Sequence, residues 1–488
     1  MHKTLPFLLL VGCGPVVSPP AYEVKLTDQV TRVQSHFRSD PPEKRNSAIP
    51  GVRRALLLEG WGDESPGPGE AHVEYTPRPA PSGPGAKLIT RFVHLADLQL
   101  ADDESPARVA STDQPGATDA AYRPHDAYLC MVAGAMTKQL AALKLNFVLL
   151  GGDNIDNAQG NELDQVMQIF RGGDLSCDTG DDDDPVAGPG NDPKDSFHSD
   201  GLGAVPWLWV TGNHDALVQG NFVVDDALRA SAIGTEPKLG TRDWRLPGGP
   251  VVQTSVPADP KRALLSSVEL LQRVAADGDG HGLTPAIAAT GLANYEWDVP
   301  DSPIRVIVLD TAARSGGSNG VLHRNVLTDF LEPALEKARA EGKWVFLAAH
   351  HSAGSLTDGD QLFGMKQTDA VLPDEFIALI TRYPNVLFNF TGHSHRHHLR
   401  TLSGAGHDVI ELTTASIADF PQQARVLELW DEDNGWLRLR ATNLDVPNDT
   451  PLLSEARVLA VMDWTTAWFN SAPTAAEDRN VDVWVKKP

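Results

Sequence analysis

Short apolar segments of strand length recur along the chain from Lys87 onward. Each is bounded by Gly, Asp or Asn, a pattern typical of strands buried inside a domain. The segments are Leu88–Leu95, Phe147–Leu150, Val205–Thr211, Ile304–Leu309, Trp344–Ala349 and Val386–Phe390.

Between several of these segments the apolar positions follow a helical period. The predicted helices are Ala127–Leu143, Glu162–Phe170, Leu327–Ala340 and Pro373–Thr381. Strands that alternate with helices predict an α/β fold with stacked layers. After residue 408 strands follow one another directly, and Asn434-Gly435 predicts a hairpin turn between Ala424–Trp430 and Trp436–Thr442.

Shifts in composition divide the chain into parts. The predicted parts are a signal segment at 1–13, a Pro- and Gly-rich, poorly structured tether at 14–86, a main domain at 87–445 with insertions at 101–126, 171–204 and 216–300, and a C-terminal extension at 446–488. The acidic stretch 174–200 is interpreted as a solvated surface loop, with a calcium site as the alternative.

The N-terminus is typical of an exported protein. Lys3 precedes the apolar run Leu5–Val11, which is far shorter than the roughly 20 residues of a membrane span and fits a secretory signal. Leu10-Val11-Gly12-Cys13 resembles a bacterial lipobox. We therefore expect a bacterial lipoprotein anchored through Cys13 on a membrane surface facing the periplasm or exterior. The alternative is a chance apolar start.

The remaining cysteines and the charge bear on compartment and partners. Cys130 and Cys177 could pair in an oxidising compartment or be two unrelated thiols.

The 488 residues, 41% of them hydrophobic, allow a large buried core. Sixty-five acidic against 41 basic residues, a formal charge of −24, argue against binding of a nucleic-acid backbone. A small phosphorylated substrate stays compatible, because bound divalent cations reverse the local field.

Five short polar blocks each follow the end of a predicted strand. They are Asp97-Leu98-Gln99, Gly152-Asp153-Asn154-Ile155-Asp156, Gly212-Asn213-His214-Asp215, His350-His351 and Gly392-His393-Ser394-His395. Ligands of open α/β folds gather at the carboxyl ends of strands, so we expect these blocks to meet at one rim. Together they offer carboxylate, imidazole and amide oxygen, which are donors for two divalent cations in phosphoester hydrolysis. No cysteine cluster is available for a soft metal site.

In order and spacing the blocks resemble the signature of the calcineurin-like metallophosphoesterases: D-x-H, GD-x-x-D, GNH-D/E, H and GH-x-H. The resemblance covers roughly residues 90–400. It implies a four-layer α-β-β-α sandwich of two mixed sheets flanked by helices. It also implies two divalent metal ions, which this donor set would take as iron, manganese, zinc or cobalt.

The resemblance further implies a role for each position. Asp97 and His395 match ligands of the first metal, Asp153 the bridging carboxylate, and Asn213, His350 and His393 ligands of the second metal. His214 matches the histidine that contacts the phosphate and protonates the leaving group, and Asp156 the acid that orients it. His351 competes with His350. We favour His350, because the preceding strand delivers it first and the family usually uses the first of such a pair.

Gln99 departs from the signature, which has histidine there. Its amide oxygen is a weaker donor for borderline metals than imidazole, so Gln99 either ligates the first metal weakly or hydrogen-bonds a bound water. Asp102, Asp103 and Glu104 are interpreted as a solvated loop. Arg123 and Arg314 are candidates for contacting substrate phosphate, with ordinary surface arginine as the alternative.

The predicted function is hydrolysis of phosphoric monoesters or diesters, in which a metal-bridging hydroxide attacks phosphorus. The alternative is a non-catalytic, metal-bearing surface lipoprotein that binds a phosphorylated ligand or a partner. His214 and Asp156 favour the enzyme, because a binding protein needs no oriented proton donor. Gln99 keeps the alternative open.

Overall fold

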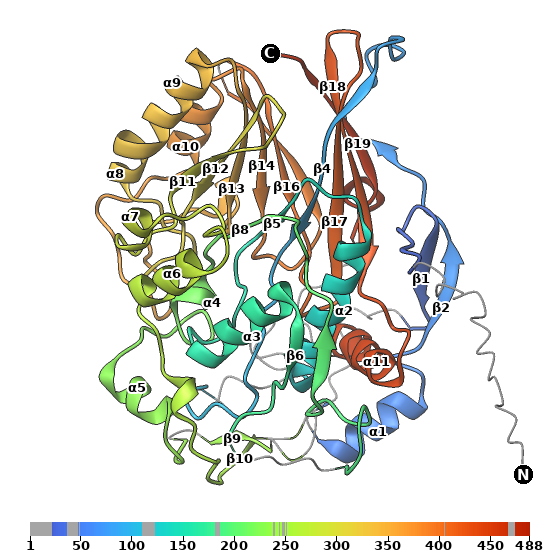
Figure 1. The fold of residues 1–488 in the computed structure, drawn as a ribbon, viewed down its shortest axis with the longest axis vertical. Coiled ribbons are helices and arrows are strands. Elements are labelled where there is room, and N and C mark those ends of the chain that lie inside the picture. Colours follow the sequence, from blue (N-terminus) through green and yellow to red (C-terminus); the bar gives the residue numbers. More distant parts are fainter. Residues whose placement is uncertain are drawn as a thin grey trace, which may run out of the picture.

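The segments predicted as strands lie in two mixed sheets in the computed structural model of the chain (Figure 1). The residues described are 22–36, 47, 49–109, 123–180, 186–237, 240–243, 245, 249, 251–404, 406–466 and 474–488. The signal segment and Cys13 lie outside them.

The first sheet has six strands in the order β11-β12-β13-β14-β16-β15. Their bounds are β11 Tyr295–Asp298, β12 Ile304–Leu309, β13 Trp344–Ala349, β14 Val386–Thr391, β15 His398–Leu402 and β16 Val409–Thr413. The four central strands run parallel, and β11 and β15 are antiparallel edges.

The second sheet has seven strands in the order β3-β19-β18-β17-β4-β5-β8. Their bounds are β3 Val73–Glu74, β4 Lys87–Leu95, β5 Phe147–Leu150, β8 Trp207–Leu208, β17 Gln423–Asp431, β18 Trp436–Asp445 and β19 Val481–Lys486. β4, β5 and β8 run parallel, whereas β17 and β18 form the predicted antiparallel hairpin.

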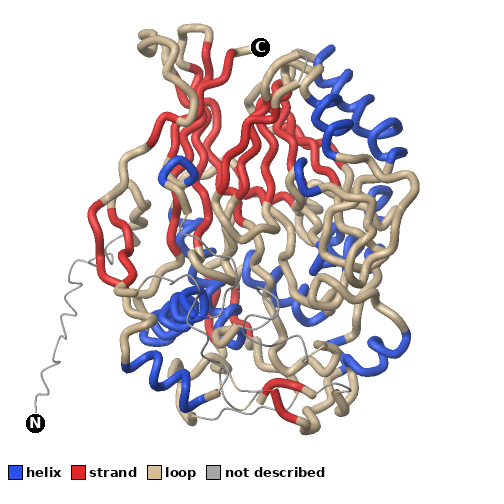
Figure 2. Tube along the Cα trace, turned by 180° about the vertical axis from the view of Figure 1, so that it is seen from behind, coloured by secondary structure: helices blue, strands red, loops and turns tan. Residues whose placement is uncertain are grey.

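Helices and three small two-stranded sheets complete the described part of the fold (Figure 2). The helices are α1 Pro50–Leu58, α2 Leu129–Ala142, α3 Gly160–Arg171, α4 Asn213–Ala216, α5 Asp226–Ala232, α6 Ser267–Ala276, α7 Pro285–Ala288, α8 Arg324–Val326, α9 Glu332–Ala340, α10 Pro373–Ile380 and α11 Pro451–Thr466. The two-stranded antiparallel sheets pair β1 Val30–Gln34 with β2 Glu64–Pro68, β6 Gly173–Leu175 with β7 Phe197–Ser199, and β9 Thr241–Arg242 with β10 Val251–Val252. Among the described residues, none of the helices combines the length and apolar character needed to cross a membrane.

The strands β5 and β13 are apolar throughout, because both of their faces are buried. Phe92 of β4 packs in the core against Phe147 of β5 and, across the interface between the sheets, against Phe346 of β13, with ring centroids 4.6 and 5.8 Å apart. On the other face of β13, Val345 and Leu347 pack in a second cluster with residues of α9 and α10. The predicted four-layer sandwich of two mixed sheets flanked by helices is therefore confirmed.

The lead-in differs from the poorly structured tether that its composition predicted. Within residues 22–86 lie β1, α1, β2 and β3, and Leu56 of α1 is fully buried in the main core. Arg457 of α11 makes a two-pronged ion pair with Glu64 of β2, at 2.8 and 2.7 Å. Pro and Gly content misled here because a few apolar side chains and ion pairs are enough to dock a segment on a large domain.

The C-terminal extension belongs to the second sheet. β19 pairs with β18 over six residues, from Val481 to Lys486, and α11 contributes buried residues to the main core. Cys130 of α2 and Cys177 form a disulfide, which answers the question that the sequence left open. This bond ties α2 to the start of the acidic insertion.

Candidate metal centre

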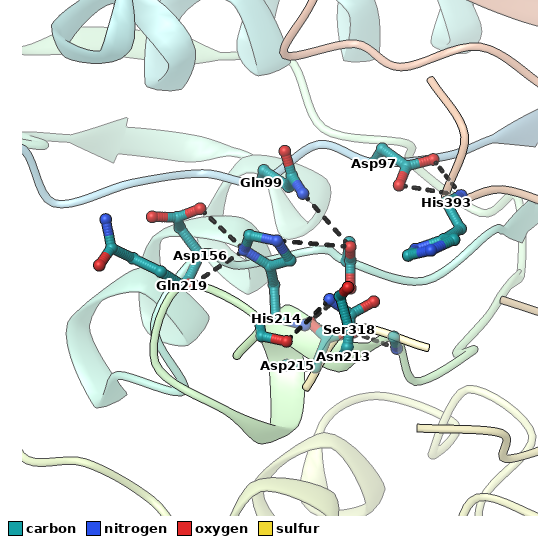
Figure 3. Close-up of polar contacts among 12 residues, drawn as sticks. Asp97, Gln99, Asp156, Asn213, His214, Asp215, Gln219, Ser318 and His393 are labelled. Atoms are coloured by element: carbon teal, nitrogen blue, oxygen red, sulfur yellow. Dashed lines mark hydrogen bonds and ion pairs between the residues drawn. The ribbon is translucent and has the colours of Figure 1, made fainter. Parts of the chain in front are cut away.

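All five polar blocks lie at the carboxyl ends of parallel strands. Asp97 follows β4, Asp153 follows β5, and Asn213 begins α4 shortly after β8. From the six-stranded sheet, His350 directly follows β13 and His393 follows β14. Figure 3 shows side chains of these blocks converging from both sheets.

The backbone is in a left-handed conformation at several of these positions. The φ angles are 53° at Asp97, 38° at Gln99, 53° at Asp153, 69° at His393 and 56° at His395. Residues other than glycine rarely adopt this conformation, which costs about 1–3 kcal/mol each and clusters at functional sites. The backbone is therefore strained at the ends of these strands, where it directs the side chains of the polar blocks toward one site.

Glycines of the blocks allow close approach between their neighbours. A Cβ on Gly212 would lie 2.0 Å from Oδ1 of Asp153, and one on Gly392 would lie 2.7 Å from Oδ2 of Asp97. Both distances are too short for any side chain, so these glycines bring the loops against the two carboxylates.

Asp153 lies at the centre of the site. Its Oδ1 accepts from the backbone N–H of His214 at 2.8 Å, and its Oδ2 accepts from Nε2 of Gln99 at 3.2 Å. Nε2 of His350 lies 3.1 Å from Oδ2 as well. Burial alone would raise the pKa of Asp153, but His350 and His214 hold it well below its usual range, so the carboxylate is anionic.

Two buried atoms beside Asp153 lack a hydrogen-bond partner: Nε2 of His350 and Oδ1 of Asn213. Nδ1 of His350 lies 2.7 Å from the carbonyl of Gly151, and Nδ2 of Asn213 donates to the carbonyl of Gly220. In the neutral imidazole of His350 and in the amide of Asn213, these bonds leave a lone pair on Nε2 and on Oδ1. Donors that share one metal at about 2.1 Å lie roughly 3 Å apart, as Nε2 of His350 and Oδ2 of Asp153 do. The residues therefore fit a divalent cation.

Two clusters of three side chains bring possible ligand atoms within 4.8 Å of one another: Asp97, Asp153 and His350, and His350, His351 and His393. His350 belongs to both. His351 is less free to bind a metal, because its Nδ1 lies 2.9 Å from Oγ1 of Thr311 and its Nε2 2.9 Å from the carbonyl of Ser318.

His395 faces Asp97 from the other side of the site. Its Nε2 lies 3.3 Å from Oδ1 of Asp97, and its Nδ1 lies 2.7 Å from Oδ2 of Asp419. Burial lowers the pKa of His395, but Asp97 and Asp419 outweigh burial and raise it to about 10. A carboxylate behind the far nitrogen is the usual way to orient a metal-binding histidine.

His214 is held in a similar way at the open side of the site, where its side chain is 13% exposed. Its Nδ1 bonds Oδ1 of Asp156 at 2.9 Å, and its Nε2 lies 3.9 Å from Oδ2 of Asp153 (Figure 3). Burial would raise the pKa of Asp156, but Arg108 and His214 lower it to about 2, so Asp156 remains a carboxylate.

Gln99 is placed differently from a metal ligand. Its amide oxygen accepts a hydrogen bond from Nη2 of Arg123, and its amide nitrogen donates to Asp153. A guanidinium has only donors, so this contact fixes which end of the amide is oxygen. The nitrogen, which cannot ligate, faces the carboxylates.

Neither candidate arginine is free to bind a substrate phosphate. Arg123 is fully buried and pairs with Asp419, and Arg314 pairs with Asp310 through two nitrogens. The reading of residues 102–104 as a solvated loop is also wrong in part. Asp102 and Glu104 are buried because Arg262 bonds both of them, at 2.8 and 2.9 Å.

The acidic insertion supplies a second cation to this loop. Nζ of Lys194 lies 2.6 Å from Glu104, 3.4 Å from Asp103 and 3.6 Å from Asp178. The ammonium group of Lys194 therefore lies between this loop and Asp178, a carboxylate of the insertion for which calcium was the alternative.

Asp419 was missed by sequence reasoning. It belongs to none of the five blocks, and its role depends on contacts with His395 and Arg123, which lie 24 and 296 residues away. A signal was present in its position, because it follows a parallel strand of the first sheet, β16, at the same rim.

The fold and the site together define a class, an α/β protein of two packed sheets with buried clusters of His and Asp at its strand ends that could hold a metal ion. The resemblance to calcineurin-like metallophosphoesterases is thus confirmed in its fold and in the clustering of its His and Asp residues.

No family model and no curated protein matches the chain. Solved structures do resemble it. A dimetal phosphatase from Danio rerio is 13% identical, with a TM-score of 0.40, over 74% of this chain and 100% of that one. Purple acid phosphatase PPD1 from yellow lupin (Lupinus luteus) seeds is 13% identical, with a TM-score of 0.32, over 78% and 54%. The sulfate thiohydrolase SoxB of Thermus thermophilus is 13% identical, with a TM-score of 0.30, over 80% and 61%.

Proposed function

We propose that this protein is a metal-dependent hydrolase of phosphoric esters that binds two divalent cations. The observation that carries the proposal is the pair of buried, unpartnered donor atoms, Nε2 of His350 and Oδ1 of Asn213, beside the anionic Asp153. Next to them stands His214, a histidine oriented by a carboxylate. Donors for a cation and an oriented proton donor in one site are what phosphoester hydrolysis requires.

Different residues of the chain would bind the two cations. Asp153 would be shared by both cations, Asn213, His350 and His393 would hold one, and Asp97 and His395 the other. When bound, the cations polarise the phosphoryl oxygens and activate water. The site binds metals that accept mixed oxygen and nitrogen donors, such as iron, manganese, zinc or cobalt.

His214 would act on the substrate itself. Asp156 holds its Nδ1, so Nε2 is the nitrogen available to the phosphoryl group and to the leaving oxygen. Burial lowers the pKa of His214, but Asp153 and Asp156 outweigh burial and raise it, which keeps a proton available for transfer. Protonation of the leaving oxygen by such a group typically contributes about 10²–10⁴-fold to the rate.

Hydrolysis of an aryl phosphate and an aryl phosphodiester, with Mn²⁺ added to metal-free protein, tests the proposal and separates monoesterase from diesterase. We expect turnover of at least one substrate that is lost on exhaustive chelation. Stoichiometric Mn²⁺ binding without turnover of either would instead favour the non-catalytic, metal-bearing surface lipoprotein. Full activity with no metal present would refute the mechanism.

We also propose that the protein is exported and anchored through Cys13, where it meets a small phosphorylated substrate outside the cytoplasm. The lipobox-like Leu10-Val11-Gly12-Cys13 supports this, as does the Cys130–Cys177 disulfide, since disulfides persist in oxidising compartments. Mass spectrometry of the native protein should find a lipidated Cys13 as its first residue. An unprocessed Met1 would contradict export by this route.

A further inference from the structure

Arg123 is a fully buried arginine that lies behind the site and contacts groups on several sides. Its Nε donates to Oδ1 of Asp419 at 2.8 Å, and its Nη2 donates to the amide oxygen of Gln99. Its Nη1 lies 3.8 Å from Oδ1 of Asp156 and 3.7 Å from Oδ1 of Asp126. Because the side chain of Arg123 is inaccessible to solvent, it does not contact a bound substrate.

Three of these partners each hold a different group of the site. Asp419 bonds Nδ1 of His395 at 2.7 Å, and Asp156 bonds Nδ1 of His214 at 2.9 Å. Gln99 donates to Oδ2 of Asp153 at 3.2 Å. The guanidinium of Arg123 is therefore linked through one intervening side chain to each of Asp153, His395 and His214.

We propose, on the basis of the function proposed above, that Arg123 is the positioning residue of the site. It keeps Asp419, Asp156 and Gln99 in register, and it withholds Gln99 from metal coordination. The planar fork of Arg123 donates hydrogen bonds to Asp419 and Gln99 in fixed directions and places Nη1 3.8 Å from Asp156. A lysine ammonium on a flexible stem has no such fixed geometry.

The contact with Arg123 explains why Gln99 stands where the signature has histidine. Because the amide oxygen accepts from the guanidinium, the amide nitrogen faces Asp153 and acts as a donor. The first metal position is then left with Asp97, His395 and the shared Asp153. The second position has Asn213, His350 and His393 besides Asp153, so it binds its cation more tightly and fills first.

Arg123→Lys tests the positioning role, because it keeps the buried charge and removes the fork. Titration of the metal-free protein with Mn²⁺, followed by calorimetry, should give binding about 10–100-fold weaker than wild type, the usual effect of losing a partner that orients metal ligands. Arg305→Lys is the matched control. Arg305 is also buried and pairs with Asp298, Glu296 and Glu341, at the opposite end of β12 from the site. The Mn²⁺ affinity of Arg305→Lys should equal that of wild type.

A purely structural role would lower thermal stability in both lysine variants and leave Mn²⁺ binding unchanged in both. That result would overturn the proposal. A second readout compares aryl phosphate esters with good and poor leaving groups. In Arg123→Lys, kcat should fall further for the poor leaving group, because misplacing Asp156 impairs proton donation by His214, while KM stays near the wild-type value. An equal fall for both esters would count against the link to His214.

Two substitutions of Gln99 test the second half of the proposal even if Arg123→Lys does not fold. Gln99→Glu keeps the shape and the partner Arg123 but turns an oxygen toward the first metal position, so the weaker Mn²⁺ ion should bind more tightly. Gln99→Met removes both polar ends and should retain that ion. Loss of the weaker ion in Gln99→Met would show that Gln99 is a ligand and overturn the proposal. These readouts measure binding, so they stand apart from any failure to detect hydrolysis.

Discussion

Nδ1 of His214 lies 2.9 Å from Oδ1 of Asp156, and this contact fixes which nitrogen of the imidazole faces the open site. Asp156 is in turn held by Arg108, whose Nη2 lies 3.7 Å from Oδ2 of the carboxylate. Arg108 helps lower the pKa of Asp156 to about 2, so the orienting group stays anionic over the whole working range of pH. The proposed role of His214 as proton donor therefore depends on Asp156 and Arg108 as well as on its own imidazole.

His214→Ala should keep the metal ions and lose rate. We expect kcat to fall about 10²–10⁴-fold for esters with poor leaving groups, because general acid catalysis is typically worth that much. The loss should shrink for leaving groups that need little protonation. Steady-state kinetics across a series of aryl esters measures the trend, and His198→Ala, at an exposed histidine of β7, serves as the control. An equal loss for all esters would mean that His214 only positions phosphate or stabilises charge.

Asp153→Ala should be the most damaging single change of a ligand. Asp153 is the carboxylate that we propose both metal ions share, and its Oδ2 lies 3.1 Å from Nε2 of His350. We expect loss of both metal ions, seen by elemental analysis after gel filtration, with the fold retained by circular dichroism. Asp164→Ala, at an exposed position of α3, should keep both ions. Two tightly bound ions in Asp153→Ala would show that the shared ligand is a different residue.

Much of the fold followed from local pattern, since β5, β12 and β13 begin and end at the predicted residues. Strands buried on both faces leave a continuous apolar run that sequence reveals directly. β11 and β19 were not foreseen, because their places are set by pairing with β12 and β18 rather than by their own composition.

The candidate site was likewise predictable only in part. The five blocks were predictable because parallel strands bring their ends to one rim. The state of Gln99 was not, because it depends on Arg123, which comes from an insertion without a motif and bonds across 24 residues of sequence. The burial of Asp102 and Glu104 likewise depends on Arg262, more than 150 residues further on. Such distant partners of charged residues leave no local pattern.

Gly212→Ala should disable the site without unfolding the protein. A Cβ at this position would lie 2.0 Å from Oδ1 of Asp153 and 2.4 Å from its backbone nitrogen, so the central carboxylate must move. We expect Mn²⁺ binding in calorimetry to weaken at least as much as on loss of an orienting partner, about 10–100-fold. Gly51→Ala is the control, because nothing lies within 4 Å of a Cβ there. Wild-type affinity in Gly212→Ala would mean that the loop yields freely and that the close approach is not needed.

The docking of the lead-in should depend on pH through Glu64 and Arg457. Burial would raise the pKa of Glu64, but Arg457, Gln34 and Arg32 outweigh burial and hold it below the ordinary value of 4.5. A carboxyl whose pKa is depressed by folding stabilises the folded state above its unfolded pKa. That contribution is lost as the pH falls through the folded-state value. The ion pair therefore supports docking at neutral pH and fails in acid.

Hydrogen exchange of the backbone amides in β1 and β2 measures this docking directly. In wild type the free energy of local opening should be constant near neutral pH and fall once the pH drops below 4.5. Glu64→Gln should lower it at pH 7 by about 3–5 kcal/mol, because Arg457 is left buried and unpaired, and should remove most of the acid dependence. Glu375→Gln breaks the exposed pair with Arg324 and should leave exchange in β1 and β2 unchanged. If β1 and β2 exchange freely at neutral pH in wild type, the composition-based view of this segment as a tether is right, and the Glu64–Arg457 pair does not hold it.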